Sequence, residues 1–193
     1  MARKAGRTFS SLRGEARQRA LKWGRERARE WIDADMLTEE LQGYAAEKHG
    51  LKADKCAFSL GYCQGDGVAF YGAFNLSTLA EKHPELDAAL VAFTLAYPDG
   101  YLQAWIEGGD SRYCHCNSMD AKIEAADCDT NQDAADVTAA WMQDYVDELL
   151  KDISRDVAKV GYAEIEYQES DEAIIETFEA NEYRFTQEGD YIT

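Results

Sequence analysis

The sequence predicts an α+β fold in which an antiparallel sheet of about five strands packs against a long C-terminal helix. Apolar residues recur at helical spacing near both ends of the chain, whereas residues 55–119 alternate with a period of two. The 193 residues are enough to bury one substantial core. We therefore expect a basic helical segment over residues 1–30 and a single acidic α+β domain over residues 31–193.

The first stretch with helical spacing runs from about Ser10 to Gly50. Its apolar residues recur at steps of three and four, and a polar break from Asp33 to Asp35 predicts two helices. The first helix is basic along its length apart from a thin apolar stripe. Gly50 stands where a glycine commonly ends a helix, one residue beyond the last turn.

The middle of the chain predicts a meander of about five strands, with a helical insert around residues 77–90 after the second strand. The dipeptide Asp66-Gly67 and the triplet Pro98-Asp99-Gly100 stand where hairpin turns are needed. The predicted strands lie within residues 58–62, 68–74, 92–97, 101–106 and 112–116.

The clearest helix is predicted over residues 138–160, where one apolar stripe is expected to pack on the sheet. A shorter helix follows over about residues 170–179, with Ser170 as its N-cap. The chain then closes in a short extended segment with a glycine turn. The predicted stripe consists of Trp141, Met142, Tyr145, Val146, Leu149, Leu150, Ile153, Val157 and Val160.

Charge is unevenly distributed along the chain. The 20 Lys and Arg residues against 37 Asp and Glu residues give a formal net charge of −17. Residues 1–30 contain ten of the basic and three of the acidic residues, a net of +7, which leaves −24 on the remaining 163 residues. Such asymmetry indicates binding to nucleic acid, acidic surfaces or basic partners and says nothing about the fold.

The sequence favours a cytosolic protein. No window approaches 18 consecutive apolar residues, and the basic N-terminus lacks the apolar core of a signal peptide. The five cysteines, an odd number, are expected to be reduced thiols rather than a disulfide framework.

The run Cys63-Gln64-Gly65-Asp66-Gly67 combines a thiol, two glycines and a carboxylate between apolar arms. A phosphate cradle needs a strand that leads into a helix N-terminus, yet strand pattern lies on both sides here. A cysteine nucleophile needs a nearby base, and the three histidines lie outside the run. We therefore expect a tight hairpin in which Asp66 bonds its own backbone. Were the hairpin functional, it would present Gln64 and Asp66 to a partner.

Two segments have the residue types of a metal site. Cys114, His115 and Cys116, together with Cys128, offer soft ligands, but a Cys-x-Cys run on a strand turns its histidine to the opposite face. The run DCDTNQDAADVT, which begins at Asp127, resembles a calcium loop without its sixth-position glycine and twelfth-position glutamate. We therefore predict no metal and no cofactor, with the cysteines filling a sheet face and the acidic run capping the next helix.

Carboxylates recur every fourth residue on the helix predicted over residues 138–160. At 1.5 Å per residue they stand about 6 Å apart along the axis, which is comparable with phosphates along one nucleic-acid strand. The row is either a partner-binding face or an ordinary solvated face, and the further acids of residues 164–182 favour binding. Its members are Asp144, Glu148, Asp152 and Asp156.

The basic start of the chain has two interpretations. Its cations would neutralise several phosphates if the segment binds nucleic acid. Trp23 and Trp31 would then either stack on bases or pack on the body of the protein. Alternatively, a segment of +7 beside a body of −24 contacts a partner or folds back onto its own protein. The arm is expected to consist of Arg13, Arg17, Lys22, Arg25 and Arg29.

Three stretches carry a family resemblance: REWIDADMLTEEL, CAFSLGYCQGDGVAFYG and YVDELLKDISRDVAKVGYAEIEYQESDEAIIETFEANEYRFTQEGD. Their order resembles a family of small phage and plasmid proteins that share a strand-QGDG-strand hairpin and are commonly described as antitoxins of toxin–antitoxin stability systems. The resemblance covers about residues 28–193. It implies a protein partner without catalysis, and it brings no catalytic or binding residues. The basic lead over residues 1–30 departs from the family, so the resemblance implies nothing about its role.

Three functional hypotheses follow. The favoured one is a non-enzymatic acidic inhibitor from a phage or another mobile element, of the anti-CRISPR or anti-restriction type. It would mimic nucleic acid and bind a basic host defence protein or nucleoprotein complex in the bacterial cytoplasm. The second is an antitoxin that neutralises a toxin while its basic arm contacts DNA. The third is a thiol- or metal-dependent enzyme centred on Cys63 or on Cys114, His115 and Cys116, and a homo-oligomer is compatible with each.

Overall fold

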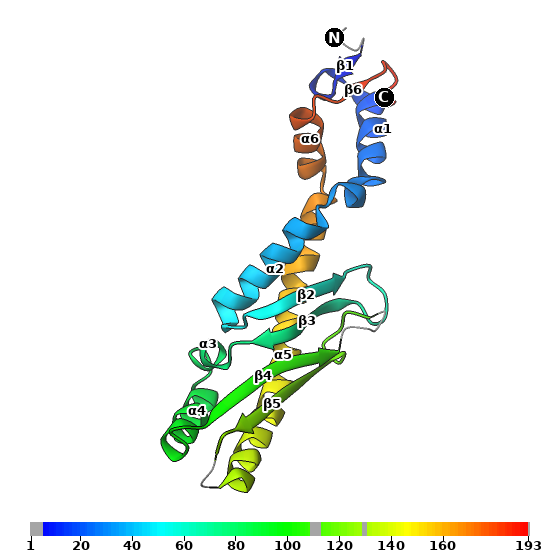
Figure 1. Ribbon diagram of the computed structural model, residues 1–193. Coiled ribbons are helices and arrows are strands. Elements are labelled where there is room, and N and C mark those ends of the chain that lie inside the picture. The colour runs from blue at the N-terminus through cyan, green and yellow to red at the C-terminus, as the bar shows by residue number, and fades with distance from the viewer. Residues whose placement is uncertain (1–5, 109–112, 129–130, 193) are drawn as a thin grey trace. The chain divides into compact units, whose positions relative to one another are not determined.

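The computed structural model describes residues 6–108, 113–128 and 131–192 and has the predicted α+β fold (Figure 1). The chain divides into two compact units. The terminal unit combines Met1–Ala34 with Tyr162–Thr193, and the sheet unit comprises Asp35–Gly161. Within the described ranges, no helix is apolar over enough of its length to span a bilayer.

The sheet unit is built on antiparallel strands that follow one another in chain order, β2-β3-β4-β5. Two helices, α3 (Leu76–Ala80) and α4 (Pro84–Ala96), lie between the second and third of these strands along the chain. This arrangement confirms the predicted meander with a helical insert. The strands are β2 (Ala53–Ser59), β3 (Gly67–Phe74), β4 (Tyr101–Gly108) and β5 (Met119–Ala126).

The prediction of a strand over residues 92–97 is wrong, because these residues form the last turns and the C-cap of α4. Pro84 occupies the first turn, where its fixed φ favours a helix. Leu86 and Phe93 are buried seven residues apart, which is the spacing of one helical face. A short apolar run does not by itself distinguish a strand from a buried helical turn.

The strand predicted over residues 112–116 is also wrong in its described part. Residues 113–115 have no regular structure, and Arg112 lies outside the described residues. The Cys-x-Cys run is therefore in a loop. The strand that pairs with β4 is instead β5, in which apolar residues from Met119 onward are buried and alternate with more exposed charged ones. That alternation is typical of a strand, yet no strand was predicted over these residues.

Helix α5 (Gln132–Gln168) covers one face of the sheet, as predicted, and extends beyond the predicted ends (Figure 1). Ser154 is buried in this contact and donates its hydroxyl to the Val68 carbonyl of β3 over 2.5 Å. A buried polar group with a partner avoids the cost of an unmade hydrogen bond. The apolar side chains that α5 buries in the sheet unit include Met142, Val146, Leu150, Ile153 and Val157.

Side chains of α5 also bond the outer edge of β5. The Ala121 amide donates to Asp147 Oδ1 over 2.5 Å, and the Ile123 amide donates to Gln143 Oε1 over 3.3 Å. Edge amides that a helix has bonded are less available for pairing with another chain. This flank of α5 is therefore engaged with the sheet, and a different side of the helix faces solvent.

Helix α2 (Ala34–His49) ends where the sequence predicted. Gly50 follows it with a φ of +74°, a left-handed conformation that favours glycine. A Cβ at this position would overlap the carbonyl oxygen of Thr78 at the start of the helical insert. Glycine therefore both ends the helix and allows the backbone of the insert to approach.

The terminal unit joins the two ends of the chain. Strand β1 (Arg7–Thr8) pairs antiparallel with β6 (Arg184–Phe185), and short 3-10 helices η1 (Phe9–Ser11) and η2 (Ala28–Trp31) flank helix α1 (Gly14–Arg25). In α6 (Asp171–Ala180), Ser170 Oγ accepts the Ala173 amide over 3.2 Å, which confirms the predicted N-cap.

An aromatic core holds the terminal unit together, and both tryptophans of the basic segment belong to it. Trp23 stacks on Tyr191 with ring centroids 4.4 Å apart, and Trp31 lies 6.0 Å from Trp23. Their rings therefore pack within the protein, the second of the two roles considered for them. The core consists of Phe9, Trp23, Trp31, Phe178, Tyr183, Phe185 and Tyr191, with smaller apolar residues around them.

Candidate functional site

Three carboxylates of the predicted row stand on the solvent side of α5. Asp144, Glu148 and Asp152 are exposed at steps of four residues. The buried residues Met142 and Val146 lie on the other side of the helix, since two residues turn an α-helix by about 200°. We call Asp144, Glu148 and Asp152 the acidic face.

Two carboxylates of the acidic face form ion pairs with cations on the same helix. Lys151 Nζ lies 2.6 Å from Glu148, and Arg155 Nη1 lies 2.8 Å from Asp152. The hydrogen bond from Lys151 lowers the pKa of Glu148 below its usual range. Exposed pairs of this kind stabilise a protein little, so a cationic partner readily replaces the internal cations.

Asp156, the fourth member of the predicted row, has a different role. Its carboxylate accepts Lys48 Nζ over 2.6 Å and the Tyr44 hydroxyl over 3.2 Å, and His49 Nε2 lies 3.0 Å away. The bonds from Lys48 and then His49 lower the pKa of Asp156 to about 2. With its side chain only 26% exposed, Asp156 ties α2 to α5 within the sheet unit.

An aromatic side chain adjoins the acidic face. Trp141, predicted to lie in the buried stripe, is 46% exposed and stacks on Tyr145 with ring centroids 5.5 Å apart. Val137, one turn earlier, is 72% exposed. Trp141 directly precedes the buried Met142, so it lies about 100° round the helix from the packed side. An exposed tryptophan beside carboxylates is typical of a protein-binding surface.

The two units differ in charge. The sheet unit contains 9 Lys and Arg residues against 23 Asp and Glu residues, a formal net charge of −14. The terminal unit contains 11 against 14, a net of −3, because the acidic C-terminal residues balance the basic N-terminal ones. The unbalanced negative charge of the protein therefore resides mainly in the unit that bears the acidic face.

All five cations predicted to form an arm have partners inside the terminal unit. Arg25 forms an ion pair with Asp171 at 2.6 Å, and Arg29 forms one with Glu169. These contacts join the basic segment to the acidic segment at the other end of the chain. The remaining partners are the carbonyls of Ser10 and Leu12 for Arg13, the ring of Phe9 for Arg17 and the carboxylate of Glu26 for Lys22.

The QGDG run ends the loop over residues 60–66 that joins β2 to β3, and its last glycine, Gly67, begins β3, so the hairpin is longer than the tight turn predicted. Asp66 organises this loop. Its Oδ1 accepts the Ser59 hydroxyl over 2.6 Å, and its Oδ2 accepts the amides of Gly61 and Cys63 over 2.8 and 2.7 Å. The bond from Ser59 is the main cause of a lowered pKa at Asp66. Asp66 thus bonds its own backbone, as predicted, while Gln64 is exposed.

The loop packs against the residues that precede β5. Gly65 has a φ of +92°, and a Cβ there would stand 3.2 Å from Tyr113 Cε1 and closer still to Cδ1. The contact brings the two sequence motifs together around an open hollow of about 710 Å³. Its described lining consists of Gln64, Gly65, Tyr113, His115, Asn117 and Ser118.

Two partly buried thiols of the sheet unit, Cys56 and Cys114, are poorly suited to nucleophilic chemistry. Burial raises the pKa of Cys56 to about 12 and also raises the pKa of Cys114, whereas a reactive cysteine needs a lowered pKa. Cys63 is exposed, and its thiol donates to the Gly61 carbonyl over 3.7 Å. Nδ1 of His115 accepts the Asn117 amide.

Metal ligands do not gather in the part of the chain that the structure describes. Within residues 6–108, 113–128 and 131–192, no group of three His, Cys, Asp or Glu side chains is placed to hold a metal ion. Cys114 and Cys116 lie in the loop before β5, and Cys128 is buried just after that strand. Asp129, part of the run resembling a calcium loop, lies outside the described residues.

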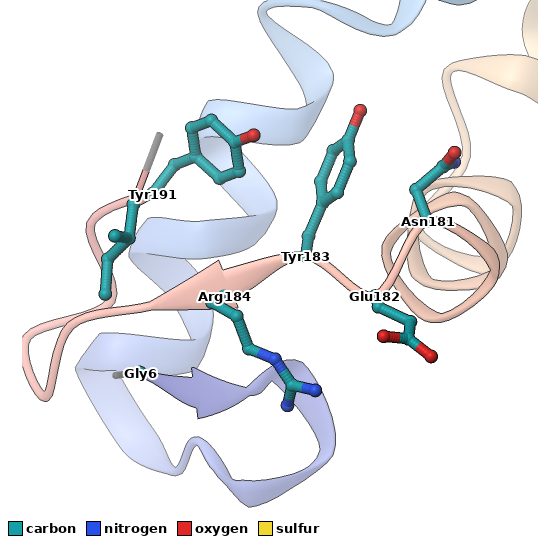
Figure 2. A pocket seen from close by; sticks show the side chains of 7 residues that line it. Gly6, Asn181, Glu182, Tyr183, Arg184 and Tyr191 are labelled. Carbon is teal, nitrogen blue, oxygen red and sulfur yellow. The ribbon is translucent and has the colours of Figure 1, made fainter. Parts of the chain in front are cut away.

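A second hollow, of about 650 Å³, lies in the terminal unit beside β6 (Figure 2). Tyr183 and Tyr191 project from one side of the extended chain toward α1, whereas Glu182 and Arg184 project from the other side. The polar side chains that line this hollow therefore point in different directions, whereas the polar groups of a small-molecule site converge on one point.

Of these features, the acidic face and its exposed tryptophan are the best placed to meet a partner. The Asp66 carboxylate is occupied by its own loop, and the arm cations are engaged within the terminal unit. Comparisons with protein-family models, with curated proteins and with solved structures find no match for this chain. Function is therefore inferred from geometry and charge.

Proposed function

We propose that this chain is a non-catalytic inhibitor from a phage or another mobile genetic element, of the anti-CRISPR or anti-restriction type. Its sheet unit docks onto a basic, nucleic-acid-binding surface of a host defence protein. The observation that carries the proposal is the acidic face, Asp144, Glu148 and Asp152, regularly spaced and exposed on a unit of net charge −14. The resemblance to mobile-element proteins with a protein partner supports the same class.

The spacing of the acidic face suits a surface that binds phosphates. Residues four apart on a helix stand about 6 Å apart along its axis, so a surface arranged for successive phosphates meets successive carboxylates. A rigid helix presents them without the entropy cost of ordering a flexible chain. The exchangeable pairs with Lys151 and Arg155 leave both carboxylates free to bind arginine or lysine of a partner.

Trp141 is expected to supply most of the apolar binding energy of the contact. Charged rims chiefly raise the rate of association and set specificity, whereas a desolvated aromatic side chain commonly dominates binding energy. Trp141 is held against Tyr145, so its ring is already oriented before binding. We expect it to enter an apolar recess on the partner, with the carboxylates of the acidic face around its rim.

The antitoxin and enzyme alternatives have less support from the geometry. The contacts of Arg25 with Asp171 and of Arg29 with Glu169 would have to break before those side chains could bind DNA. The raised pKa of Cys114 weighs against a thiol nucleophile in the run Cys114, His115 and Cys116. We therefore assign the binding activity to the sheet unit.

The experiment is capture of host proteins on immobilised full-length protein, with elution in a salt gradient and identification by mass spectrometry. The test variant carries Asp144→Asn, Glu148→Gln and Asp152→Asn. The matched control carries Glu39→Gln, Glu40→Gln and Glu47→Gln, which removes three exposed carboxylates from α2 and gives the same net charge.

We expect the wild type and the α2 control to retain one basic nucleic-acid-binding protein until moderate salt, and the acidic-face variant to lose it. Equal loss from both variants would reduce the effect to net charge and contradict a specific face. Capture of a small toxin in place of a nucleic-acid-binding protein would support the antitoxin alternative.

A further inference from the structure

From Ala88 onward, helix α4 presents an uncharged apolar side to solvent. Leu95 is 77% exposed and Val91 is 51% exposed, and Ala88 and Ala92 beside them are also exposed. These four positions follow the i, i+3, i+4, i+7 spacing of a single helical stripe. We call them the α4 stripe. Leu86 and Phe93 on other positions of the helix are buried and hold it to the sheet unit.

The α4 stripe is unusual for a surface helix of this protein. Residues 88–98 contain no Asp, Glu, Lys, Arg or His, although 30% of the whole chain is charged. A surface helix ordinarily carries charged or polar residues on its outer side. Exposed apolar residues that are contiguous, rather than scattered singly, mark an interaction surface.

Charge identifies the kind of partner that fits the stripe. A basic protein gains nothing from a surface without carboxylates, and it is better matched by the acidic face on α5. Two copies of this chain, each of net charge −17, repel each other wherever acidic surfaces meet. The carboxylates of α4 are confined to its first turn, at Glu85 and Asp87, so two copies that pair antiparallel set this acidic end of one helix beside the uncharged end of the other. A two-fold interface needs a patch that matches itself, and a neutral apolar stripe does so.

We propose that two copies associate through the α4 stripe, helix against helix across a two-fold axis. The two alanines allow the helices to approach, and Val91 and Leu95 provide the apolar area that is removed from water. A helix of 13 residues is about 20 Å long, so one pair of helices buries an area at the low end for specific interfaces. The dimer is therefore weak and depends on concentration.

This inference is independent of the proposed function, because it uses a different helix and a different force. Salt separates the two. Screening weakens the attraction of the acidic face for a basic partner, whereas it reduces the repulsion between two like-charged copies. Dimerisation should thus increase with salt over the range in which partner binding decreases.

The experiment is sedimentation velocity of the full-length protein over a concentration series, at low and at moderate salt. Leu95→Lys is the test variant. This substitution makes the net charge less negative and so reduces the repulsion between two copies. A loss of dimer would therefore mean that residue 95 is buried in the interface. Val137→Lys on α5 is the control, since Val137 is exposed to a similar extent, 72%. Circular dichroism verifies that both variants are folded.

We expect the wild type and Val137→Lys to shift from the 21.7 kDa monomer toward twice that mass as concentration rises. Leu95→Lys should require at least about tenfold more protein to reach the same fraction of dimer, because a buried charge without a partner opposes association. A wild type that stays monomeric at the highest concentration and salt, or a Leu95→Lys variant that dimerises like the wild type, would overturn the proposal.

Discussion

Asp66 shows how one carboxylate fixes a loop that the sequence marks as a possible site. Its two oxygens accept the hydroxyl of Ser59, at the end of β2, and two amides from residues that precede it in the loop. The sequence supported this role, because a short acidic side chain between glycines commonly bonds nearby backbone. The length of the loop and its contact with Tyr113 were beyond sequence reasoning, since they depend on residues about fifty positions away.

Replacing Asp66 by alanine should loosen the loop without unfolding the protein. The amides of Gly61 and Cys63 lose their acceptor, so their hydrogen exchange should accelerate on the order of tenfold, the equivalent of one hydrogen bond. Exchange measured by mass spectrometry on loop peptides tests this. Gln64→Ala, in the same loop, should leave exchange unchanged. Unchanged protection in the Asp66→Ala protein would contradict the anchoring role.

Asp156 makes the same point for the acidic row. Spacing alone placed it with Asp144, Glu148 and Asp152, yet α2 supplies three polar groups that occupy it. Helical periodicity determines which residues share a face of one helix. It does not reveal which part of that face a second helix covers, so Asp156 could not be separated from the row by sequence.

The pKa of Asp156 predicts an acid-sensitive contribution to stability. It is about 2 in the folded protein, below the value near 3.9 of an aspartate in an unfolded chain. The stabilisation is therefore complete above the unfolded pKa and is lost as pH falls through the folded pKa. Between about pH 5 and pH 2, the free energy of unfolding should fall on the order of 1 kcal/mol further in the wild type than in Asp156→Asn.

Chemical denaturation at several pH values measures this difference. Asp152→Asn is the control, because Asp152 is well exposed and its pair with Arg155 contributes little. It should keep the pH dependence of the wild type. If Asp156→Asn also keeps it, the carboxylate does not tie α2 to α5.

At the scale of elements, the long periodic segments were predictable and the short apolar ones were not. The apolar residues of helix α5 recur at helical spacing over many turns, which predicts a helix. The end of α2 at Gly50 follows from the freedom of glycine to adopt a positive φ. The segment 92–97 is a short apolar run, which fits a strand and a buried helical turn equally well. Only its continuity with the helix that begins at Pro84 and buries Leu86 favours a helix.

Close packing of α1 and α6 gives a prediction for two glycines. Gly24 lies in α1, and a Cβ there would overlap Ile174 Cγ2 and lie 2.8 Å from Phe178 Cζ of α6. Gly43 lies in α2, and a Cβ there meets nothing within 4 Å. Gly43→Ala should raise the free energy of unfolding by about 0.5–1 kcal/mol through helix propensity, whereas Gly24→Ala should lower it by about 1–3 kcal/mol through overlap.

Equilibrium denaturation of the two alanine variants beside the wild type measures both effects. The pair controls itself, because both substitutions add one methyl group inside a helix. Equal stabilisation by the two variants would mean that α1 and α6 do not approach closely at Gly24.

At the scale of the whole molecule, charge is divided between the units in a way that the chain order obscures. The sequence presents a basic start and an acidic remainder, yet folding places the basic start with the acidic C-terminal residues. Arg25 with Asp171 and Arg29 with Glu169 join segments about 140 positions apart. Sequence reasoning left this pairing open, because it depends on which ends of the chain meet. The excess negative charge is then concentrated in the sheet unit.

The central claim is that the acidic face occupies the nucleic-acid-binding surface of a partner. The most direct measurement is competition: the partner captured by the wild type is loaded with a labelled nucleic acid that it binds, and this protein is titrated in. We predict that the wild type and the α2 control displace the nucleic acid, and that the acidic-face variant needs at least about tenfold more protein to do so. Simultaneous binding of the wild type and the nucleic acid to the partner would contradict the claim.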